Sequence, residues 1–213
     1  SDDDVPVLSA DVLALVQQLQ HAQQEREQQA MEGETMPEED WQLSQFWYSE
    51  ETAVKLCEEI QAACADLPEG ANVALVSTPT LLPTFKKLEG FQSGRLRVKL
   101  FENDTRFGTI HPDEFVHYDY NAPLNVPSTL HAHFDFVIAD PPFLAPECTK
   151  KFAETIRLIG KKEAKIMVCT GATMEDTVVS ELQAHRTPFR PGHANNLSND
   201  FASFANYEVK TLI

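Results

Sequence analysis

The sequence predicts an α/β fold in which a mostly parallel sheet follows a helical N-terminal region. From Gly70 onward, short apolar segments alternate with segments of helical periodicity. This alternation is typical of βαβ units, whose successive strands run parallel. Sheets of this kind bind ligands at the carboxyl ends of their strands. The residues that directly follow each strand are therefore the first candidates for a functional site.

The N-terminal region is expected to contain two helices. Ser9 can cap a helix over 9–30, in which apolar residues recur at i, i+3, i+4 and i+7. A polar linker follows at 32–40. A second helix begins after Ser49 and runs to about Asp66, with a single apolar stripe.

Seven strands are expected after these helices. Some are continuous apolar runs, such as the one that ends at Ala139, whereas Leu96, Val98 and Leu100 alternate with basic residues. The expected strands are 73–76, 96–100, 115–118, 134–139, 164–170, 201–207 and 208–213, and the helices between them are 79–88, 146–158 and 173–184.

The charge of the chain is concentrated towards its N-terminus. The 213 residues carry 33 acidic and 17 basic side chains, for a net charge of −16. Residues 1–69 hold 17 of the acids and only two bases, Arg26 and Lys55. Duplex nucleic acid repels such a balance, so stable nucleic-acid binding is not expected. We divide the chain into an acidic, helical and flexible extension at 1–39 and one domain at 40–213.

The remaining composition favours a cytoplasmic protein without a metal. No apolar run is long enough to span a membrane, and the acidic start does not resemble a signal peptide. The four cysteines form no CxxC pair, which favours reduced thiols. No cysteine or carboxylate cluster completes a metal site around His131 and His133. We interpret the histidines, His193 among them, as surface or strand-flanking residues.

The most specific motif is Asp140-Pro141-Pro142-Phe143, which directly follows an expected strand. The two prolines end the strand, fix the backbone and donate no N–H, so the turn is rich in acceptors. Acceptors can orient an amine, and the Phe143 ring can pack on a flat base or an alkylammonium stem. We therefore interpret these four residues as catalytic in a reaction at an amino group. Taken alone, the same motif could simply end a strand.

Polar and aromatic residues also follow the expected second and third strands. Glu102 and Asp104 end the second strand, where an acid commonly binds ribose hydroxyls. Asp119, Tyr120 and Asn121 end the third strand and could hold the amino group and ring of adenine, although they could also form an ordinary turn. Polar and aromatic residues thus follow the second, third and fourth expected strands. This regular placement predicts a Rossmann-like, class I S-adenosylmethionine-dependent methyltransferase fold.

The loop after the first strand contains Ser77, Thr78 and Pro79, and no glycine occurs between Gly70 and Gly90. S-adenosylmethionine has no pyrophosphate, so it does not need the glycine-rich cradle that a nicotinamide dinucleotide requires. The loop therefore argues against a dehydrogenase. We expect its hydroxyls and main chain to approach the methionine half of the cofactor.

Three consecutive aromatic residues, Phe46, Trp47 and Tyr48, precede the second helix. They lie in a polar neighbourhood, so a helix with one apolar face would bury little of them. We expect them to fold over the cofactor as a lid. The alternative is a hydrophobic clamp on the core of the domain.

Together these residues resemble one family, the eukaryotic elongation factor 1-alpha lysine methyltransferases, once described as N6-adenine-specific DNA methyltransferases. The resemblance covers about residues 40–207, and the glycine-poor first loop belongs to the family pattern. Position 143 is Phe where relatives often carry Tyr, so the ring is kept and the hydroxyl is lost. The matching stretches are Asp40–Tyr48, Phe101–Phe107, Tyr118–Asn121, Phe134–Phe143 and Cys169–Glu175, with Pro191, His193, Leu197, Asn199 and Phe201 in the tail.

The resemblance implies methyl transfer from S-adenosyl-L-methionine to a lysine ε-amine of elongation factor 1-alpha, leaving S-adenosyl-L-homocysteine. The residues alone indicate methyl transfer to a nitrogen. Asp140 and the Pro141 carbonyl would orient a neutral amine, while Phe143 and an aromatic residue of the lid would hold the lysine stem. Two alternatives stay open: an N6-adenine methyltransferase of nucleic acid, and a non-catalytic methyltransferase-like binding domain.

The acidic N-terminal third gains a possible meaning from this resemblance. A translation factor that handles transfer RNA is expected to be basic. We therefore hypothesise that residues 1–69 offer a docking surface to a basic protein partner, the alternative being a solvated tail.

Overall fold

The structure is a computed structural model that describes residues 12, 14, 16–21, 36–39, 46–195 and 200–213. It contains two compact units, Ser1–Pro37 and Glu38–Ile213. In the first unit, residues 12, 14 and 16–21 are helical and exposed, and the rest of the expected helix over 9–30 lies outside the described residues. Most of the expected linker at 32–40 also lies outside them.

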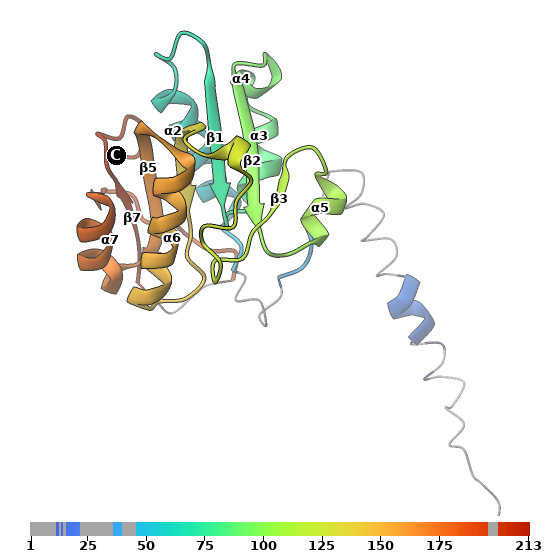
Figure 1. The fold of residues 1–213 in the computed structure, drawn as a ribbon. Helices are drawn as coiled ribbons and strands as arrows, with labels where there is room; N and C mark the ends of the chain where they lie inside the picture. Colours follow the sequence, from blue (N-terminus) through green and yellow to red (C-terminus); the bar gives the residue numbers. More distant parts are fainter. Residues whose placement is uncertain (1–11, 13, 15, 22–35, 40–45, 196–199) are drawn as a thin grey trace, which may run out of the picture. The chain divides into compact units, whose positions relative to one another are not determined.

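A seven-stranded sheet forms the centre of the second unit, in the order β3-β2-β1-β4-β5-β7-β6 (Figure 1). The first five strands run parallel to one another, and β7 is antiparallel to both β5 and β6. The predicted mostly parallel, seven-stranded sheet is therefore confirmed. The strands are β1 (Ala71–Val76), β2 (Leu96–Glu102), β3 (Phe115–His117), β4 (Phe134–Ala139), β5 (Gly160–Gly171), β6 (His185–Arg186) and β7 (Phe201–Ala205).

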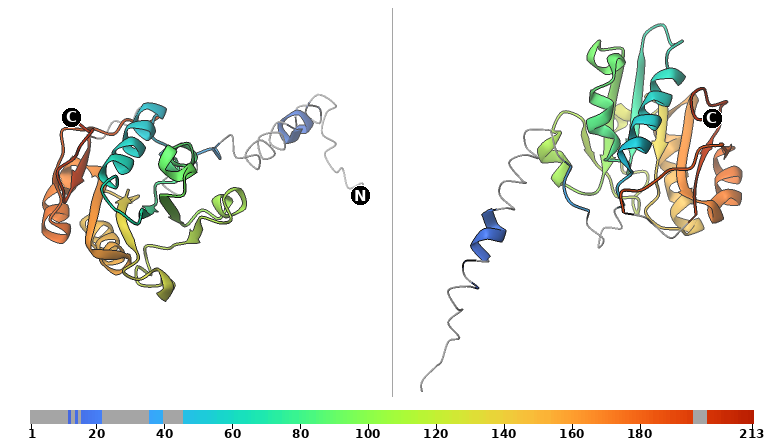
Figure 2. Two further views of the ribbon diagram at one scale, coloured as in Figure 1. Left: turned by 90° about the horizontal axis from the view of Figure 1, so that it is seen from above. Right: turned by 180° about the vertical axis from the view of Figure 1, so that it is seen from behind.

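Helices cover both faces of this sheet, with α6 and α7 on one face and α2, α3 and α4 on the other (Figure 2). The predicted helix over 79–88 is the shorter α3, and a further short helix, α4, follows Leu88, whose backbone is extended. Among the described residues, no helix is long and apolar enough to cross a membrane. The α-helices are α2 (Glu50–Ala63), α3 (Leu81–Lys86), α4 (Glu89–Gln92), α5 (Arg106–Ile110), α6 (Pro146–Ile159) and α7 (Glu175–Leu182).

Helix α2 begins where the sequence predicts. The Ser49 hydroxyl caps it by accepting a 3.2 Å hydrogen bond from the backbone N–H of Thr52. Leu56, Cys57 and Ile60 form part of a fully buried stripe on this helix. The cap therefore fixes the point where the chain turns from the segment 46–48 into the core.

The prediction of a last strand over 208–213 is wrong. The sheet takes β6 as its seventh strand instead, and the tail is held by a buried side chain. The Glu59 carboxylate accepts the backbone N–H groups of Lys210 and Thr211 at 3.0 and 2.7 Å. Those N–H groups are therefore satisfied without a neighbouring strand.

Candidate active site

The carboxyl ends of β1, β2, β3 and β4 lie side by side because the parallel register aligns them. Val76 at the end of β1 pairs with Phe101 of β2 and with Ala139 at the end of β4. Glu102 at the end of β2 pairs with His117 at the end of β3. The residues that follow each strand are thus brought to one edge of the sheet, as expected for this architecture.

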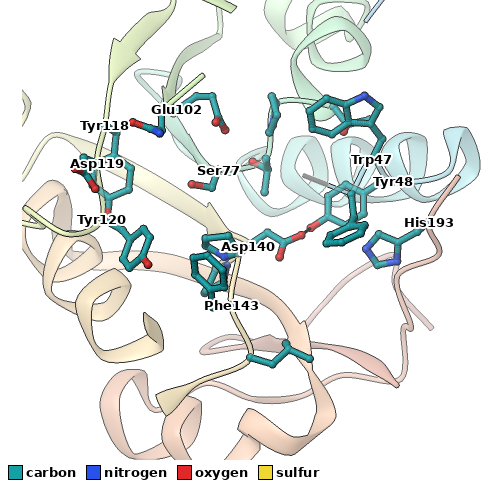
Figure 3. Close-up of a pocket in the computed structure, with 18 of the residues that line it drawn as sticks. Trp47, Tyr48, Ser77, Glu102, Tyr118, Asp119, Tyr120, Asp140, Phe143 and His193 are labelled. Atoms are coloured by element: carbon teal, nitrogen blue, oxygen red, sulfur yellow. Dashed lines mark hydrogen bonds between the residues drawn. The ribbon is translucent and has the colours of Figure 1, made fainter. Parts of the chain in front are cut away.

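A cavity of about 420 Å³ opens at this edge (Figure 3). Its volume lies in the range of sites that enclose a small molecule, roughly 300–1,000 Å³. Four strand ends, the segment before α2 and two C-terminal residues form its walls. The lining residues are Phe46, Trp47, Tyr48, Ser77, Thr78, Pro79, Thr80, Glu102, Asn103, Tyr118, Asp119, Tyr120, Asn121, Asp140, Pro141, Pro142, Phe143, Leu144, His193 and Phe201.

All of the predicted site residues except Asp104 line this cavity. The buried carboxylate of Asp104 instead pairs with Arg106, whose guanidinium donates to it at 2.7 Å. The backbone N–H of Arg106 donates to the same carboxylate at 3.0 Å. Asp104, a predicted cofactor-binding residue, therefore organises the turn after β2 and does not line the cavity.

Asp140 lies at the centre of the cavity (Figure 3). Its backbone N–H continues the sheet ladder by donating to the Val76 carbonyl at 3.1 Å. Its Oδ2 atom accepts a 2.6 Å hydrogen bond from the Tyr48 hydroxyl. Burial raises the pKa of Asp140 to about 7, against the lowering effect of the Tyr48 hydroxyl, and the charge of Glu102 raises it further. Such a carboxyl group can accept a proton near neutral pH.

Glu102 presents a second buried carboxyl group across the cavity from Asp140. Burial raises its pKa to about 7, although a backbone hydrogen bond from Asp104, 3.1 Å long, acts in the opposite direction. The edge of the sheet thus carries two carboxyl groups that can hold a proton near neutral pH. Because Glu102 ends β2, it is placed to accept hydroxyl groups of a bound ribose.

Aromatic rings form one side of the cavity. The Tyr120 ring lies 6.0 Å from Phe143 and stacks on Phe152 at 5.8 Å between centroids. Phe143 is 46% exposed, so its ring is available at the rim. Asp119 accepts the backbone N–H of Asn121 at 2.8 Å, an Asx turn that shapes the loop after β3. This side can therefore hold a flat ring between an aromatic residue and polar groups.

The loop after β1 adopts a conformation that normally favours glycine. Ser77 has a φ of 55°, in the left-handed region, and its N–H donates to the Phe101 carbonyl at 2.8 Å. The adjacent Thr78 is buried, and its hydroxyl has no hydrogen-bond partner in the described part of the chain. A buried hydroxyl without a partner costs free energy, so it marks a position where a bound ligand can supply one.

Residues distant in the sequence close the remaining side of the cavity. Phe46, Trp47 and Tyr48 line it, as the predicted lid requires, while residues 40–45 of the same segment lie outside the described residues. His193 and Phe201 also line it. The interpretation of His193 as a surface or strand-flanking residue is wrong, because its ring lies between Tyr48 and Phe201. The place of His193 at the cavity could not be predicted from the sequence, because it depends on the pairing of the C-terminal segment with residues near Tyr48.

In the described ranges, no group of three or more His, Cys, Asp or Glu side chains is arranged to hold a metal ion. All four cysteines are free and buried.

Comparisons with known proteins agree with this geometry. A family model described as "Probable N6-adenine methyltransferase" matches residues 39–209. A protein-lysine N-methyltransferase of Caenorhabditis elegans is 50% identical over 212 residues, which cover 98% of this chain and 97% of that protein. The EEF1A lysine methyltransferase 1 of Homo sapiens is 41% identical over 212 residues, covering 97% of this chain and 94% of that protein.

The fold is also found in solved structures. A branched-chain polyamine synthase mutein from Thermus thermophilus, in complex with N4-aminopropylspermidine and 5'-methylthioadenosine, superposes with a TM-score of 0.59. It is 15% identical and covers 83% of this chain and 60% of that one, so it shows a shared fold alone.

Proposed function

Because this chain belongs to the family of the EEF1A lysine methyltransferases, we propose that it transfers a methyl group from S-adenosyl-L-methionine to a lysine ε-amine of elongation factor 1-alpha. The proposed chemistry rests on Asp140, a buried carboxyl group whose pKa is raised to about 7. It directly follows β4 and precedes two prolines in the turn. That turn offers acceptors to an amine and no competing proline N–H.

The cavity fits S-adenosyl-L-methionine, which supplies an electrophilic methyl group on its sulfonium sulfur. Glu102 would accept the ribose hydroxyls, and the Tyr120 ring with Asp119 and Asn121 would hold the adenine. The Thr78 hydroxyl, which has no partner among the described residues, and the main chain of the glycine-free loop would meet the methionine half. The volume of about 420 Å³ is sufficient for a ligand of this class.

The substrate amine must lose a proton before it can attack. A free lysine has a pKa of about 10.4, so it is protonated at neutral pH. Asp140, with a pKa raised to about 7 by burial, can accept that proton or orient the neutral amine. The exposed Phe143 ring at the rim can pack on the alkyl stem.

A protein substrate is favoured over nucleic acid by the distribution of charge. Several basic residues of α6 and β5 contact acidic side chains: Lys151 lies 3.4 Å from Glu147 and Lys161 lies 2.8 Å from Asp135. Arg157 likewise pairs with Glu181. These residues therefore do not offer an unopposed basic surface to phosphates, and the net charge of −16 opposes such binding.

Labelled S-adenosyl-L-methionine added to a cell lysate with this protein tests the assignment. We expect the label in a protein of elongation-factor size, and label in DNA or RNA would favour the N6-adenine alternative. We place the reaction in the cytoplasm, a proposal supported by the four free, buried thiols.

A further inference from the structure

Two segments far apart in the sequence form a short antiparallel strap beside the cavity. Tyr48 and His193 are partners in an isolated β-bridge. The backbone N–H of Ser49 donates to the Gly192 carbonyl at 2.9 Å, and the N–H of Ala194 donates to the Trp47 carbonyl at 2.9 Å. The segment before α2 is therefore fixed by the C-terminal segment, and the two are joined by backbone geometry rather than by side chains alone.

The side chain of His193 extends this connection to the sheet. Its ring centroid lies 5.5 Å from that of Tyr48 and 4.6 Å from that of Phe201. Phe201 is the first residue of β7 and pairs with Gly171 at the end of β5. The Tyr48 ring is thus held, through His193, against the same sheet edge that carries the site.

Tyr48 connects this strap to the proposed catalytic group. The Tyr48 side chain is buried, and its hydroxyl donates to Oδ2 of Asp140 at 2.6 Å (Figure 3). Burial raises the pKa of Tyr48 well above its usual value, so the hydroxyl stays protonated and remains a donor. Within the described ranges, no other side chain donates to the Asp140 carboxylate. One carboxylate oxygen is occupied, and the other remains for a ligand.

We propose that Tyr48 and His193 are positioning residues for methyl transfer: Tyr48 fixes the Asp140 carboxylate so that Oδ1 meets the substrate amine, and His193 holds Tyr48 in place. This inference rests on the proposed function, because it assigns Asp140 to the amine. It gives the aromatic segment before α2 a second task besides covering a bound cofactor, since a covering ring needs no hydroxyl.

The variant Tyr48→Phe separates these two tasks, because it keeps the ring and removes only the hydroxyl. We expect kcat to fall at least about tenfold at pH 7, the order expected for losing a hydrogen bond to a charged group. Calorimetric affinity for S-adenosyl-L-homocysteine should stay within about twofold of the wild type. The matched control is Tyr207→Phe, which removes the Tyr207 hydroxyl that donates to Glu59 at 3.0 Å, away from the cavity.

The pH dependence of kcat supplies a readout that a merely structural role would not move. The Tyr48 hydroxyl lowers the pKa of Asp140, so removing it should raise that pKa further. The acidic limb of the profile should then shift upward by about one pH unit, and activity should partly recover at higher pH. The other titratable groups near Asp140 or Tyr48 are Glu102, Cys148, Cys169 and the adjacent His193, which stay unchanged in the variant.

Replacements of His193 test the second half of the inference. Burial lowers the pKa of His193, although Glu39 acts in the opposite direction. The imidazole is therefore neutral at pH 7, and we expect it to act by packing its flat ring against Tyr48. His193→Ala should lower kcat and shift the acidic limb in the same direction as Tyr48→Phe, whereas His193→Phe should restore most of the activity. The exposed His185, replaced by Ala, is the control.

The outcomes separate the two proposals. If the wild type labels no protein lysine, the proposed function fails. If the wild type is active, and Tyr48→Phe keeps its kcat and its pH profile, the positioning role of Tyr48 is overturned. If Tyr48→Phe instead loses affinity for S-adenosyl-L-homocysteine with unchanged kcat, the residue serves only to cover the cofactor, which also contradicts the inference.

Discussion

The hydroxyl of Thr211, near the C-terminus, donates a 2.6 Å hydrogen bond to the carboxylate of Glu59, which is buried in helix α2. The same carboxylate accepts the Tyr207 hydroxyl at 3.0 Å. The residues after β7 are therefore tied to a helix on one face of the sheet. Aromatic residues in this tail suggest a strand, but the buried acceptor on α2 determines where its backbone donors go.

Replacing Glu59 with Ala should destabilise the domain. Four donor groups, on the partly buried Tyr207 and the exposed Lys210 and Thr211, lose their buried acceptor in the variant. A lost hydrogen bond to a charged group costs about 1.5–3 kcal/mol, and water can replace part of what the exposed donors lose. We expect the free energy of unfolding in urea to fall by about 3 kcal/mol in total. The exposed neighbour Glu58, replaced by Ala, should change it by less than about 0.5 kcal/mol. Equal effects of the two replacements would contradict this role for Glu59.

Replacing Asp140 with Ala should abolish methyl transfer while the fold survives. The carboxylate is needed to accept a proton from the amine or to orient it. It contributes little to folding, because it has one hydrogen-bond partner among the described side chains and its burial is unfavourable. Circular dichroism should show an unchanged fold. Single-turnover labelling should show a loss of at least about a thousandfold, within the 10²–10⁴-fold range typical of one acid–base group. Full activity in this variant would remove Asp140 from the mechanism.

Stability should depend on pH through Glu102. Its pKa is raised by burial from the model-compound range to about 7, so the folded state binds the proton more tightly than the unfolded state does. The contribution of Glu102 to the free energy of unfolding is therefore fully present below its unfolded pKa of about 4.3. It is lost as the pH rises towards the folded pKa of about 7. We expect the free energy of unfolding to fall between pH 5 and pH 7.5 by an amount on the order of 2–3 kcal/mol.

The variant Glu102→Gln provides the comparison for that measurement. Its unfolding free energy should vary less over the same pH interval, although Asp140 contributes a dependence of the same sign. Calorimetry should also show weaker binding of S-adenosyl-L-homocysteine, because the amide replaces a charged acceptor for ribose. An unchanged pH dependence in the variant would assign the effect to other groups.

Phe143 should matter for the protein substrate more than for the cofactor. Phe143→Ala should raise the Michaelis constant for the protein substrate about fivefold, since an aromatic contact with an alkylammonium stem is worth on the order of 1 kcal/mol. Phe143→Tyr should keep the constant near that of the wild type. Leu124 is 61% exposed and does not line the cavity, so Leu124→Ala is the matched control.

Deleting residues 1–37 tests the hypothesis of an acidic docking surface. This segment is a separate compact unit, so its removal leaves Glu38–Ile213 intact as the second unit. The Michaelis constant for a basic protein substrate should rise, and the difference should shrink as the salt concentration increases. An identical Michaelis constant with and without the segment would contradict the docking surface and support the alternative, a solvated tail.

The sequence predicts most of the residues at the carboxyl edge of the sheet, because each of them ends or directly follows a strand that is recognisable from its apolar residues. Asp140 and Glu102 each follow an apolar strand, and parallel pairing brings such residues together. The left-handed backbone of Ser77 is not predicted, because glycine is the usual residue for it. The role of His193 is also hidden, since nothing near it in the sequence shows that it would pack on Tyr48. Long-range contacts of this kind come from the fold.

The central claim is tested most directly by incubating the purified protein with labelled S-adenosyl-L-methionine and purified elongation factor 1-alpha, followed by amino-acid analysis of the product. Parallel reactions would contain transfer RNA or duplex DNA in place of the protein. We predict labelled methyl-lysine from elongation factor 1-alpha and no label in either nucleic acid. Labelled N6-methyladenine, with no labelled lysine, would contradict the account.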